Sequence, residues 1–135
     1  MSELHAQGRP DVFRPGFCEE LRQRINDFFA VPEYDVIVAC LDGAACGFAV
    51  VQYVERPKSG YQCARRFYHI EEFGVDPAFR RRGVGTALLD FCRGAARRRG
   101  FARLELDVWS FNEAAQRFYA SAGFRPYRCL LESDV

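Results

Sequence analysis

The sequence predicts a single α/β domain, residues 1–135, in which helices cover both faces of a mixed sheet. Three observations lead to this prediction. The chain has 135 residues and 49% of them are hydrophobic, which is enough for one packed core. Asp42-Gly43 separates two β-rich runs, as in a hairpin. Strand-like and helix-like runs alternate from residue 66 onward, and a strand–helix–strand unit makes its two strands parallel neighbours.

The N-terminal part predicts helical structure around a loop. We expect Leu4 to Gln7 to be the end of a helix, and the "GRPDVFRPG" that follows holds two prolines and two glycines, which is typical of a loop. From Phe17 to Phe29 apolar residues recur at helical spacing, and Pro32 ends the run.

The middle of the chain predicts three strands. Residues 35–54 are β-rich on both sides of Asp42-Gly43 and form the expected hairpin. A polar, exposed connection follows at residues 55–64. Arg66 to Val75 is then predicted as a third strand, closed by Asp76-Pro77.

The C-terminal part predicts two helices and two strands. A helix begins near Gly83, because apolar residues recur on one of its faces. Phe101 to Trp109 is predicted as a strand, since its apolar and charged residues alternate. A short helix is expected from about Asn112 to Ala122, and Tyr127 to Leu131 is predicted as a last strand.

Composition excludes several classes of function. The formal charge of +1 gives no surface-wide field for binding nucleic acid or an anionic membrane. No apolar run approaches the roughly 18 residues of a membrane span, and the polar N-terminus has no signal-peptide core, so we expect a cytoplasmic protein. The six cysteines never form a C-x-x-C pair and there are two histidines, which predicts neither a metal site nor a disulfide framework.

A triplet of arginines followed by glycine occurs at both ends of the long helix. Arg97–Arg99 come directly before Gly100, where cations complement the partial negative charge of a helix C-terminus, so no ligand is needed. Arg80–Arg82 stand at the N-terminus, where the same argument makes cations unfavourable. Gly83 and Gly85 allow the first backbone N–H groups to converge on one point, which predicts a phosphate cradle. The alternative is a solvated loop with surface arginines.

Two common phosphate motifs do not fit this cradle. A P-loop needs the pattern G-x-x-x-x-G-K-[ST], and both its spacing and its lysine are lacking here. A dinucleotide fingerprint needs a third glycine where Leu88 stands.

The cradle resembles the pyrophosphate loop of the GNAT superfamily of acyl-CoA-dependent N-acetyltransferases. The family pattern [QR]-x-x-G-x-[GA] is filled by Arg80, Gly83 and Gly85, after a strand that ends at Val75. The resemblance implies a mostly antiparallel sheet with a parallel, splayed strand pair, and acetyl-CoA as cosubstrate. It also implies that the cofactor pyrophosphate is bound by Arg80, Arg81, Arg82, Gly83, Val84, Gly85 and Thr86.

A second family signature follows the next strand. It is supplied by Asn112, Phe118, Tyr119, Gly123 and Phe124. By resemblance, Asn112 binds the pantetheine arm of the cofactor, Phe118 lines it and Tyr119 lies beside its sulfur. Asn112 and Tyr119 are nearly two helical turns apart and so share one face. The alternatives are that Asn112 only caps the helix, with Ser110-x-x-Glu113 as a capping box, and that Tyr119 is a core aromatic.

The resemblance also implies catalytic roles. The backbone N–H groups of Phe73, Gly74 and Val75 would bind the thioester carbonyl and pantetheine, and a glycine within a strand is typical of close backbone approach. Tyr119, with an ordinary pKa near 10, is the expected general acid for the leaving thiolate.

The identity of the general base stays open at this point. Glu71 is the expected base, acting directly or through water, and His69 or Glu72 are alternatives. Strand alternation places His69 and Glu71 on one side of the strand and Glu72 on the other.

The expected function is transfer of an acetyl group from acetyl-CoA to an amine of a small molecule or peptide, by direct attack in a ternary complex. The alternative is a non-catalytic acyl-CoA-binding regulatory module. Family members usually begin with a strand and a helix, whereas Met1 to His5 enter within that helix, so we expect the opening strand to be missing. An uncovered sheet edge would then favour a homodimer.

Overall fold

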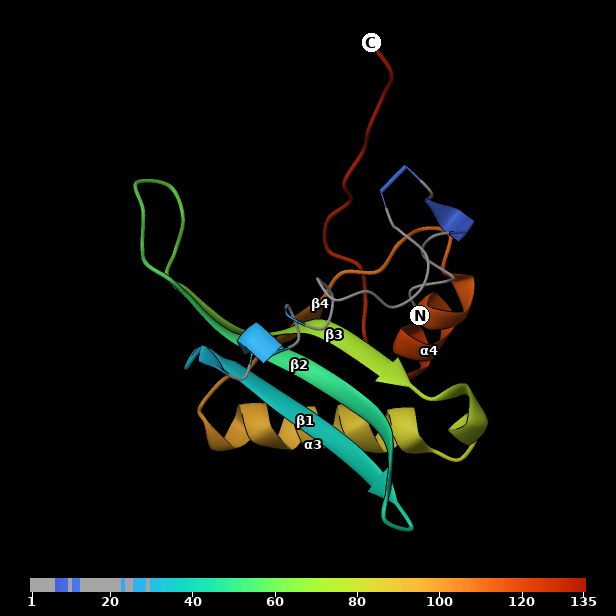
Figure 1. Cartoon of the computed structure of the whole chain (residues 1–135). Coiled ribbons are helices and arrows are strands. Elements are labelled where there is room, and N and C mark those ends of the chain that lie inside the picture. Colours follow the sequence, from blue (N-terminus) through green and yellow to red (C-terminus); the bar gives the residue numbers. More distant parts are fainter. Residues whose placement is uncertain (1–6, 10, 13–22, 24–25, 29) are drawn as a thin grey trace.

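The computed structural model describes residues 7–9, 11–12, 23, 26–28 and 30–135. The described part contains a sheet with strand order β1-β2-β3-β4, which is antiparallel except for the parallel pair β3 and β4. The elements are β1 (Tyr34–Leu41), β2 (Ala44–Arg56), β3 (Arg65–Val75), the 3₁₀ helix η1 (Pro77–Phe79), α3 (Val84–Arg98), β4 (Leu104–Leu106) and α4 (Glu113–Ser121) (Figure 1). The predicted mixed α/β fold with a mostly antiparallel sheet is confirmed.

Two predictions concern the N-terminal residues that are mostly outside this description. The prediction that Met1 to His5 enter within the first helix, so that the opening strand is missing, concerns residues that lie outside the described ones. Of the helix predicted over 17–29, residues 23 and 26–28 are described and are helical. Among the described residues, no helix is long and apolar enough to cross a membrane.

Helix α3 covers one face of the sheet and forms the core with it. Its residues Leu88, Leu89, Cys92, Ala95 and Ala96 are buried, as a helical apolar face requires. Cys92, Ala95 and Ala96 form one buried cluster with Ala49 and Val51 of β2 and Tyr68 of β3, and these three sheet residues are fully buried. In Figure 1 this helix runs beneath the sheet, and its N-terminus lies below the end of β3.

The hairpin turn between β1 and β2 and the C-terminal end of α3 form as predicted. Asp42 and Gly43 have φ values of 52° and 81°, the positive values that a two-residue hairpin turn requires. At the end of α3, Gly100 has φ of 78° and donates its N–H to Arg97 O, while Phe101 donates to Ala96 O. These two hydrogen bonds form a Schellman motif, so the carbonyl end of the helix is closed by the backbone itself.

A bulge at Glu71 interrupts the regular alternation of β3. Ile70 is paired with Val51 of β2, whereas Glu72 is paired with Val50, so Glu71 is an extra residue with no partner in β2. Because of this insertion, even-numbered residues of β3 face α3 before the bulge and odd-numbered residues face it afterwards.

The bulge corrects the predicted placement of the acidic residues. His69 is opposite Gln52 and Glu72 is opposite Val50, and Gln52 and Val50 lie on the same face of β2. His69 and Glu72 therefore share the sheet face away from α3, and the prediction that Glu72 lies on the other side from His69 was wrong. Simple alternation failed because it counts every residue as paired.

Strands β3 and β4 separate after a short parallel ladder. Pairing joins Tyr68, His69 and Ile70 to Leu104, Glu105 and Leu106. Beyond Ile70, β3 continues to Val75 with β2 as its neighbour on one side only. This opening is the predicted splay of the parallel pair.

Two predicted strands differ from the structure. The strand predicted over 101–109 covers only β4, because the Schellman motif holds Phe101 against the core and β4 leaves the sheet after Leu106. The strand predicted over 127–131 is irregular. A β-rich segment needs a neighbouring strand, and β4 offers a ladder of only three residues. Side chains hold this tail instead: Tyr127 donates to Glu105 (2.9 Å) and Arg9 binds Glu132.

A polar network joins the C-terminal end of α3 to the sheet. The carboxylate of Asp35 in β1 accepts hydrogen bonds from the hydroxyls of Tyr53 and Tyr68 and from Arg99. Arg99 also lies 4.2 Å from the centroid of the Tyr53 ring. Burial, followed by the hydrogen bond to Asp35, raises the pKa of Tyr53 to about 12. Burial also raises the pKa of Tyr68.

These tyrosines predict alkaline destabilisation. Both folded pKa values lie above the ordinary value of 10.0. The contribution of Tyr53 to stability is therefore fully present below pH 10 and is lost as pH rises through about 12. We expect the free energy of unfolding to fall between pH 10 and pH 12. Phenolate absorbance at 295 nm should appear at higher pH in the folded protein than in the unfolded protein. The variant Tyr53→Phe should reduce the pH dependence, whereas the control Tyr61→Phe, at an 89% exposed residue, should not. Ionisation of all six tyrosines near pH 10 in the folded protein would contradict this.

Candidate cofactor and catalytic site

The loop before α3 has the open backbone that the phosphate cradle requires. Gly83 is the N-cap of α3 with φ of 78°, and no side chain caps the helix. The first N–H groups of a helix have no intrahelical acceptor, so those of Val84, Gly85 and Thr86 are available to a ligand. Arg81 has φ of 63°, an uncommon value for a residue with a Cβ. Backbone strain of this kind is concentrated at functional sites.

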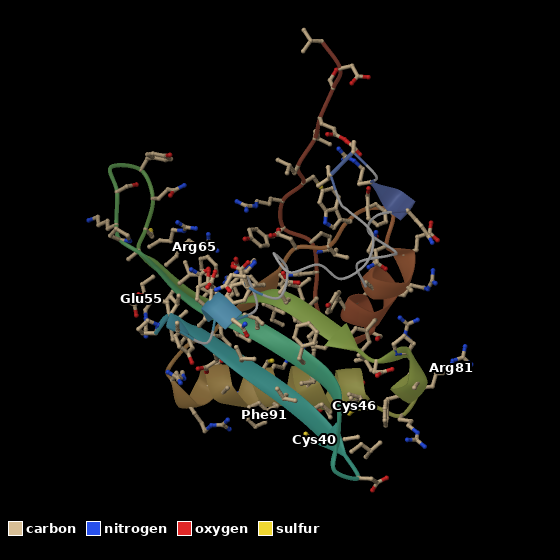
Figure 2. The ribbon with its side chains drawn as sticks, viewed as in Figure 1. Cys40, Cys46, Glu55, Arg65, Arg81 and Phe91 are labelled. Carbon is tan, nitrogen blue, oxygen red and sulfur yellow. The ribbon has the colours of Figure 1, made fainter. Side chains whose placement is uncertain are left out.

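The arginines of this loop have no carboxylate partner within the described part of the chain. Arg80, Arg81 and Arg82 are exposed, and Arg82 only stacks over Phe79 at 5.6 Å. No ion pair joins any of the three to a described residue. Figure 2 shows Arg81 extending from the loop into solvent.

The triplet at the other end of α3 is used differently. Arg99 pairs with Asp35 at 3.3 Å, and Arg98 stacks over Phe91 at 5.5 Å. The helix C-terminus beside them is the favourable end for cations. The two triplets therefore differ in their surroundings. The second lies at the helix end that favours cations and one of its arginines pairs with a carboxylate, whereas the first lies at the unfavourable end and none of its arginines pairs with a described carboxylate.

Helix α4 packs directly against the cradle. A Cβ added to Gly85 would lie 3.2 Å from Cζ of Phe118, so a side chain here would press on that ring. The ring of Phe73 lies 6.1 Å from those of both Phe118 and Tyr119. The structure therefore brings together the end of β3, the first turn of α3 and the two aromatic residues of α4, as the sequence predicts.

The end of β3 directs two backbone N–H groups toward the splay. Asp76 donates its N–H to Cys46 O of β2 at 2.8 Å. Successive residues of an antiparallel strand direct their N–H groups to alternate sides, so that of Gly74 also points toward β2. Phe73 and Val75 then direct theirs toward the β4 side, where the strands have separated. These two are the donors that the splay offers to a ligand.

Tyr119 is held in an apolar environment. Burial, with a smaller contribution from the charge of Cys92, raises the pKa of its hydroxyl to about 12. Its ring also lies 5.6 Å from that of Phe124. No described residue forms a hydrogen bond with its hydroxyl group. At neutral pH Tyr119 is therefore protonated and its O–H is free to donate.

Asn112 is the N-cap of α4. Its Oδ1 accepts a hydrogen bond from the N–H of Ala115 at 3.2 Å. The capping box suggested for Ser110 is not formed, because the helix begins at Glu113 rather than one residue after Ser110. No described residue accepts a hydrogen bond from the Nδ2 of Asn112, so capping leaves its amide donors available for a ligand.

Acidic side chains surround His69 on the sheet face away from α3. Its Nε2 lies 4.0 Å from Glu71 and 3.8 Å from Asp107, which follows β4. Sequence patterns did not predict that Asp107 reaches His69, since this contact depends on the parallel register between His69 and Glu105. Glu105 itself is buried and is bound by Arg65 at 2.5 Å and by Tyr127. The labelled Arg65 lies near the start of β3 in Figure 2.

Comparison with known proteins identifies the family. Residues 3–124 match the model of the acetyltransferase (GNAT) family. The chain is 32% identical over 123 residues to aminoglycoside N(6')-acetyltransferase type 1 of Klebsiella aerogenes, covering 86% of this chain and 78% of that protein. It is 30% identical over 138 residues to the L-amino acid N-acetyltransferase AaaT of Escherichia coli, covering 90% of this chain and 73% of that protein.

A solved structure has the same fold. It is that of the tetramutant of the BH1408 protein from Bacillus halodurans, which superposes with a TM-score of 0.93 at 25% identity and covers 99% of this chain and 86% of that one. The match to the family model spans both the cradle before α3 and the whole of α4. The chain therefore belongs to the GNAT family and is an acetyl-CoA-dependent N-acetyltransferase.

Proposed function

We propose that residues 1–135 act as one domain in which acetyl-CoA and an amine bind together and the amine attacks the thioester directly. The observation that carries this proposal is the cradle at the N-terminus of α3, where exposed arginines and open N–H groups lie beside the splay of β3 and β4. An anion at this point would offset both the arginine charges and the positive end of the helix.

The cofactor would lie along the cradle and the splay. Its pyrophosphate would be bound by the side chains of Arg80, Arg81 and Arg82 and by the backbone of Gly83, Val84, Gly85 and Thr86. The side chain of Val84 is buried in the core, so only its N–H group would take part. Asn112 would donate from Nδ2 to the pantetheine arm, Phe118 would line it, and the carbonyls would be bound at Phe73 and Val75. Gly74 would contribute the absence of a side chain.

The chemical step needs a base, a donor for the oxyanion and an acid. The amine nitrogen attacks the thioester carbon, and its proton passes to Glu71, directly or through water. The negative charge that develops on the carbonyl oxygen is stabilised by one N–H group of the splay, that of Phe73 or that of Val75, because N–H groups two residues apart on a strand cannot both reach one oxygen. The intermediate then expels the thiolate of CoA, which receives a proton from the hydroxyl of Tyr119. The products are an N-acetylated amine and CoA with a free thiol.

The acceptor side favours a cationic amine. Glu71 and Asp107 lie beside His69, whereas Glu105 is already neutralised by Arg65. An ammonium group would be attracted by these carboxylates and deprotonated at the site. We propose a small amine or a peptide amine as the acceptor. The similarity to an aminoglycoside and an amino-acid acetyltransferase supports this class.

The surroundings of the site support two further proposals. Among the described residues β1 has a neighbour only in β2, and an open edge of this kind favours a homodimer, which light scattering would detect as a doubled mass. We also propose a cytoplasmic location, supported by five described cysteines that are all free thiols. A non-catalytic regulatory module is less well supported, since the curated relatives reported above are acetyltransferases by name.

A thermal shift followed by an amine panel tests the function. We expect acetyl-CoA at 100 times its Kd to stabilise the protein by about 2.7 kcal/mol, because only the folded state binds it. Release of the CoA thiol should then be measured with an aminoglycoside, an amino acid and a short peptide. Stabilisation without turnover of any amine would favour the regulatory module. The absence of stabilisation by any acyl-CoA would contradict both functions.

A further inference from the structure

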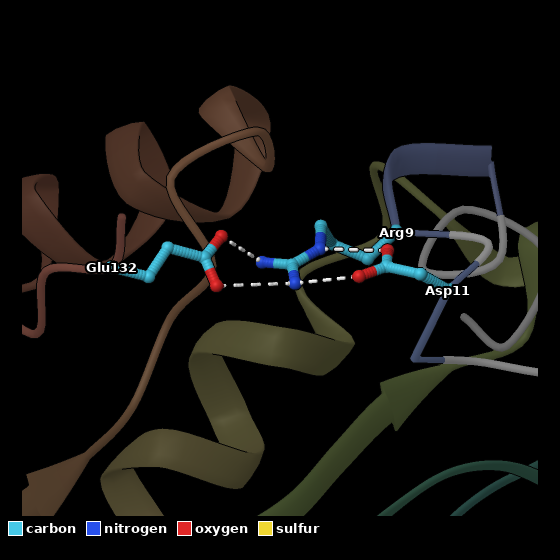
Figure 3. Close-up of polar contacts among 3 residues, drawn as sticks. All are labelled: Arg9, Asp11 and Glu132. Atoms are coloured by element: carbon cyan, nitrogen blue, oxygen red, sulfur yellow. Dashed lines mark hydrogen bonds and ion pairs between the residues drawn. The ribbon is translucent and has the colours of Figure 1, made fainter. Parts of the chain in front are cut away.

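Three segments far apart in the sequence meet at Arg9. Its guanidinium binds Asp11 through two hydrogen bonds of 2.8 and 2.9 Å and Glu132 at 2.7 Å (Figure 3). It also lies over the ring of Trp109, 5.5 Å from its centroid. We call Arg9, Asp11, Trp109 and Glu132 the terminal clasp. It ties a segment near the start of the chain and the C-terminal tail to the connection between β4 and α4.

A second contact shows that the N-terminal segment is seated on the same connection. A Cβ added to Gly8 would lie 2.4 Å from Cδ2 of Phe111, so the backbone at Gly8 rests directly on that ring. Phe111 in turn stacks with Trp109 at 5.8 Å. The clasp is thus part of a packed junction, and Arg9, with a side chain only 26% exposed, is at its centre.

The clasp matters more for the β4 end of this connection, which leads to the proposed acceptor site, than for its α4 end, which leads to the proposed cofactor site. Toward α4, the turn has its own hydrogen bonds: Asn112 N–H donates to Trp109 O, and the side chain of Gln116 donates to the carbonyls of Trp109 and Ser110. Toward β4, no backbone hydrogen bond to another described residue holds Asp107 or Val108. The position of Asp107 beside His69 therefore depends on how Trp109 is anchored.

We propose that Arg9 is a positioning residue for acceptor binding, which clamps Trp109 and thereby holds Asp107 beside His69. This inference rests on the proposed acetyl transfer. Arginine suits the role because its planar fork binds two carboxylates while its face stacks on an aromatic ring. Arg9 itself need not touch the acceptor, the cofactor or any reacting atom.

The experiment compares steady-state kinetics of Arg9→Ala with those of wild type, using the amine that the panel shows to be turned over fastest. We expect the KM for the amine to rise by about fivefold, while kcat and the KM for acetyl-CoA stay within about twofold. Glu132→Gln should shift the amine KM in the same direction and serves as the second variant if Arg9→Ala fails to fold. The matched control is Arg117→Ala, which removes an exposed ion pair on α4 and should change nothing.

Two further readouts separate positioning from general stability. Trp109 is the chain's single tryptophan, so acrylamide quenching of its fluorescence reports the clasp without any turnover, and it should increase in Arg9→Ala. In an Asp107→Asn background, Arg9→Ala should have no further effect on the amine KM, because it acts through Asp107.

An unchanged amine KM in both clasp variants, or equal rises in the KM values for amine and acetyl-CoA, would overturn the inference while leaving the proposed function intact. Full additivity with Asp107→Asn would also overturn it. A wild-type protein that turns over no amine would overturn the proposed function and this inference with it.

Discussion

Replacing Arg80 and Arg82 together with alanine is expected to weaken acetyl-CoA binding by about 100-fold. Each charge-assisted hydrogen bond to an anion contributes about 1.5–3 kcal/mol, and every 1.4 kcal/mol corresponds to about tenfold in affinity. Both arginines are exposed and lack an ion-pair partner among the described residues, so their loss should leave the fold unchanged. Titration calorimetry with acetyl-CoA would give the Kd. Increasing salt should weaken acetyl-CoA binding by the wild-type protein more than binding by the variant.

The chain supplies its own control for this experiment. Arg97 and Arg98 have the same residue type on the same helix, are exposed and form no ion pair with a described residue. Arg99 is unsuitable, because it binds Asp35 and stacks on Tyr53. Arg97→Ala with Arg98→Ala should leave the Kd within about twofold and cost up to about 1 kcal/mol of stability per residue through the helix dipole. Equal losses of affinity in the two double variants would contradict the assignment of the cradle.

Tyr119→Phe is expected to lower kcat by about 100-fold with little change in the KM for acetyl-CoA. A positioned general acid contributes about 10²–10⁴-fold to a rate, and phenylalanine keeps the ring contacts with Phe73 and Phe124 while removing the proton donor. Because the pKa of Tyr119 is raised to about 12, activity should not decline through ionisation of this group until the pH rises toward that value. Steady-state kinetics between pH 7 and pH 10 would measure both effects.

The control for Tyr119 is Tyr61→Phe, which removes a hydroxyl from an exposed residue of the β2–β3 connection. It should leave kcat unchanged. The companion variant Glu71→Gln should lower kcat/KM by about 100-fold, as loss of a positioned base does, and an unchanged kcat/KM would transfer that role to His69, Glu72 or water. Wild-type turnover in Tyr119→Phe would remove Tyr119 from the mechanism.

Features determined by neighbouring residues were predictable. The hairpin turn at Asp42-Gly43 and the helix end at Gly100 follow from residues that tolerate positive φ, and both formed as expected. The uncapped helix start at Gly83 was predictable for the same reason, whereas the binding of a phosphate there stays a prediction.

Features that depend on a partner strand or a distant segment were not predictable. The composition of residues 127–131 suits a strand, but whether a strand forms depends on a neighbour with free backbone groups. The pairing of Arg9 with Glu132 joins residues 123 positions apart, and no local pattern indicates it. The reach of Asp107 to His69 likewise required the register of two strands.

The bulge gives Glu71 a structural role that is independent of its proposed chemical role. For the fold, what matters is that a residue is present there at all, because its presence turns Phe73 and Val75 toward the core and places Gly74 and Glu72 on the other face. For the chemistry, what matters is which side chain it carries. Substitution and deletion at this position should therefore have different effects. A substitution changes only the side chain offered to the reaction, whereas a deletion would reverse which face of the sheet each residue from Glu72 to Val75 occupies.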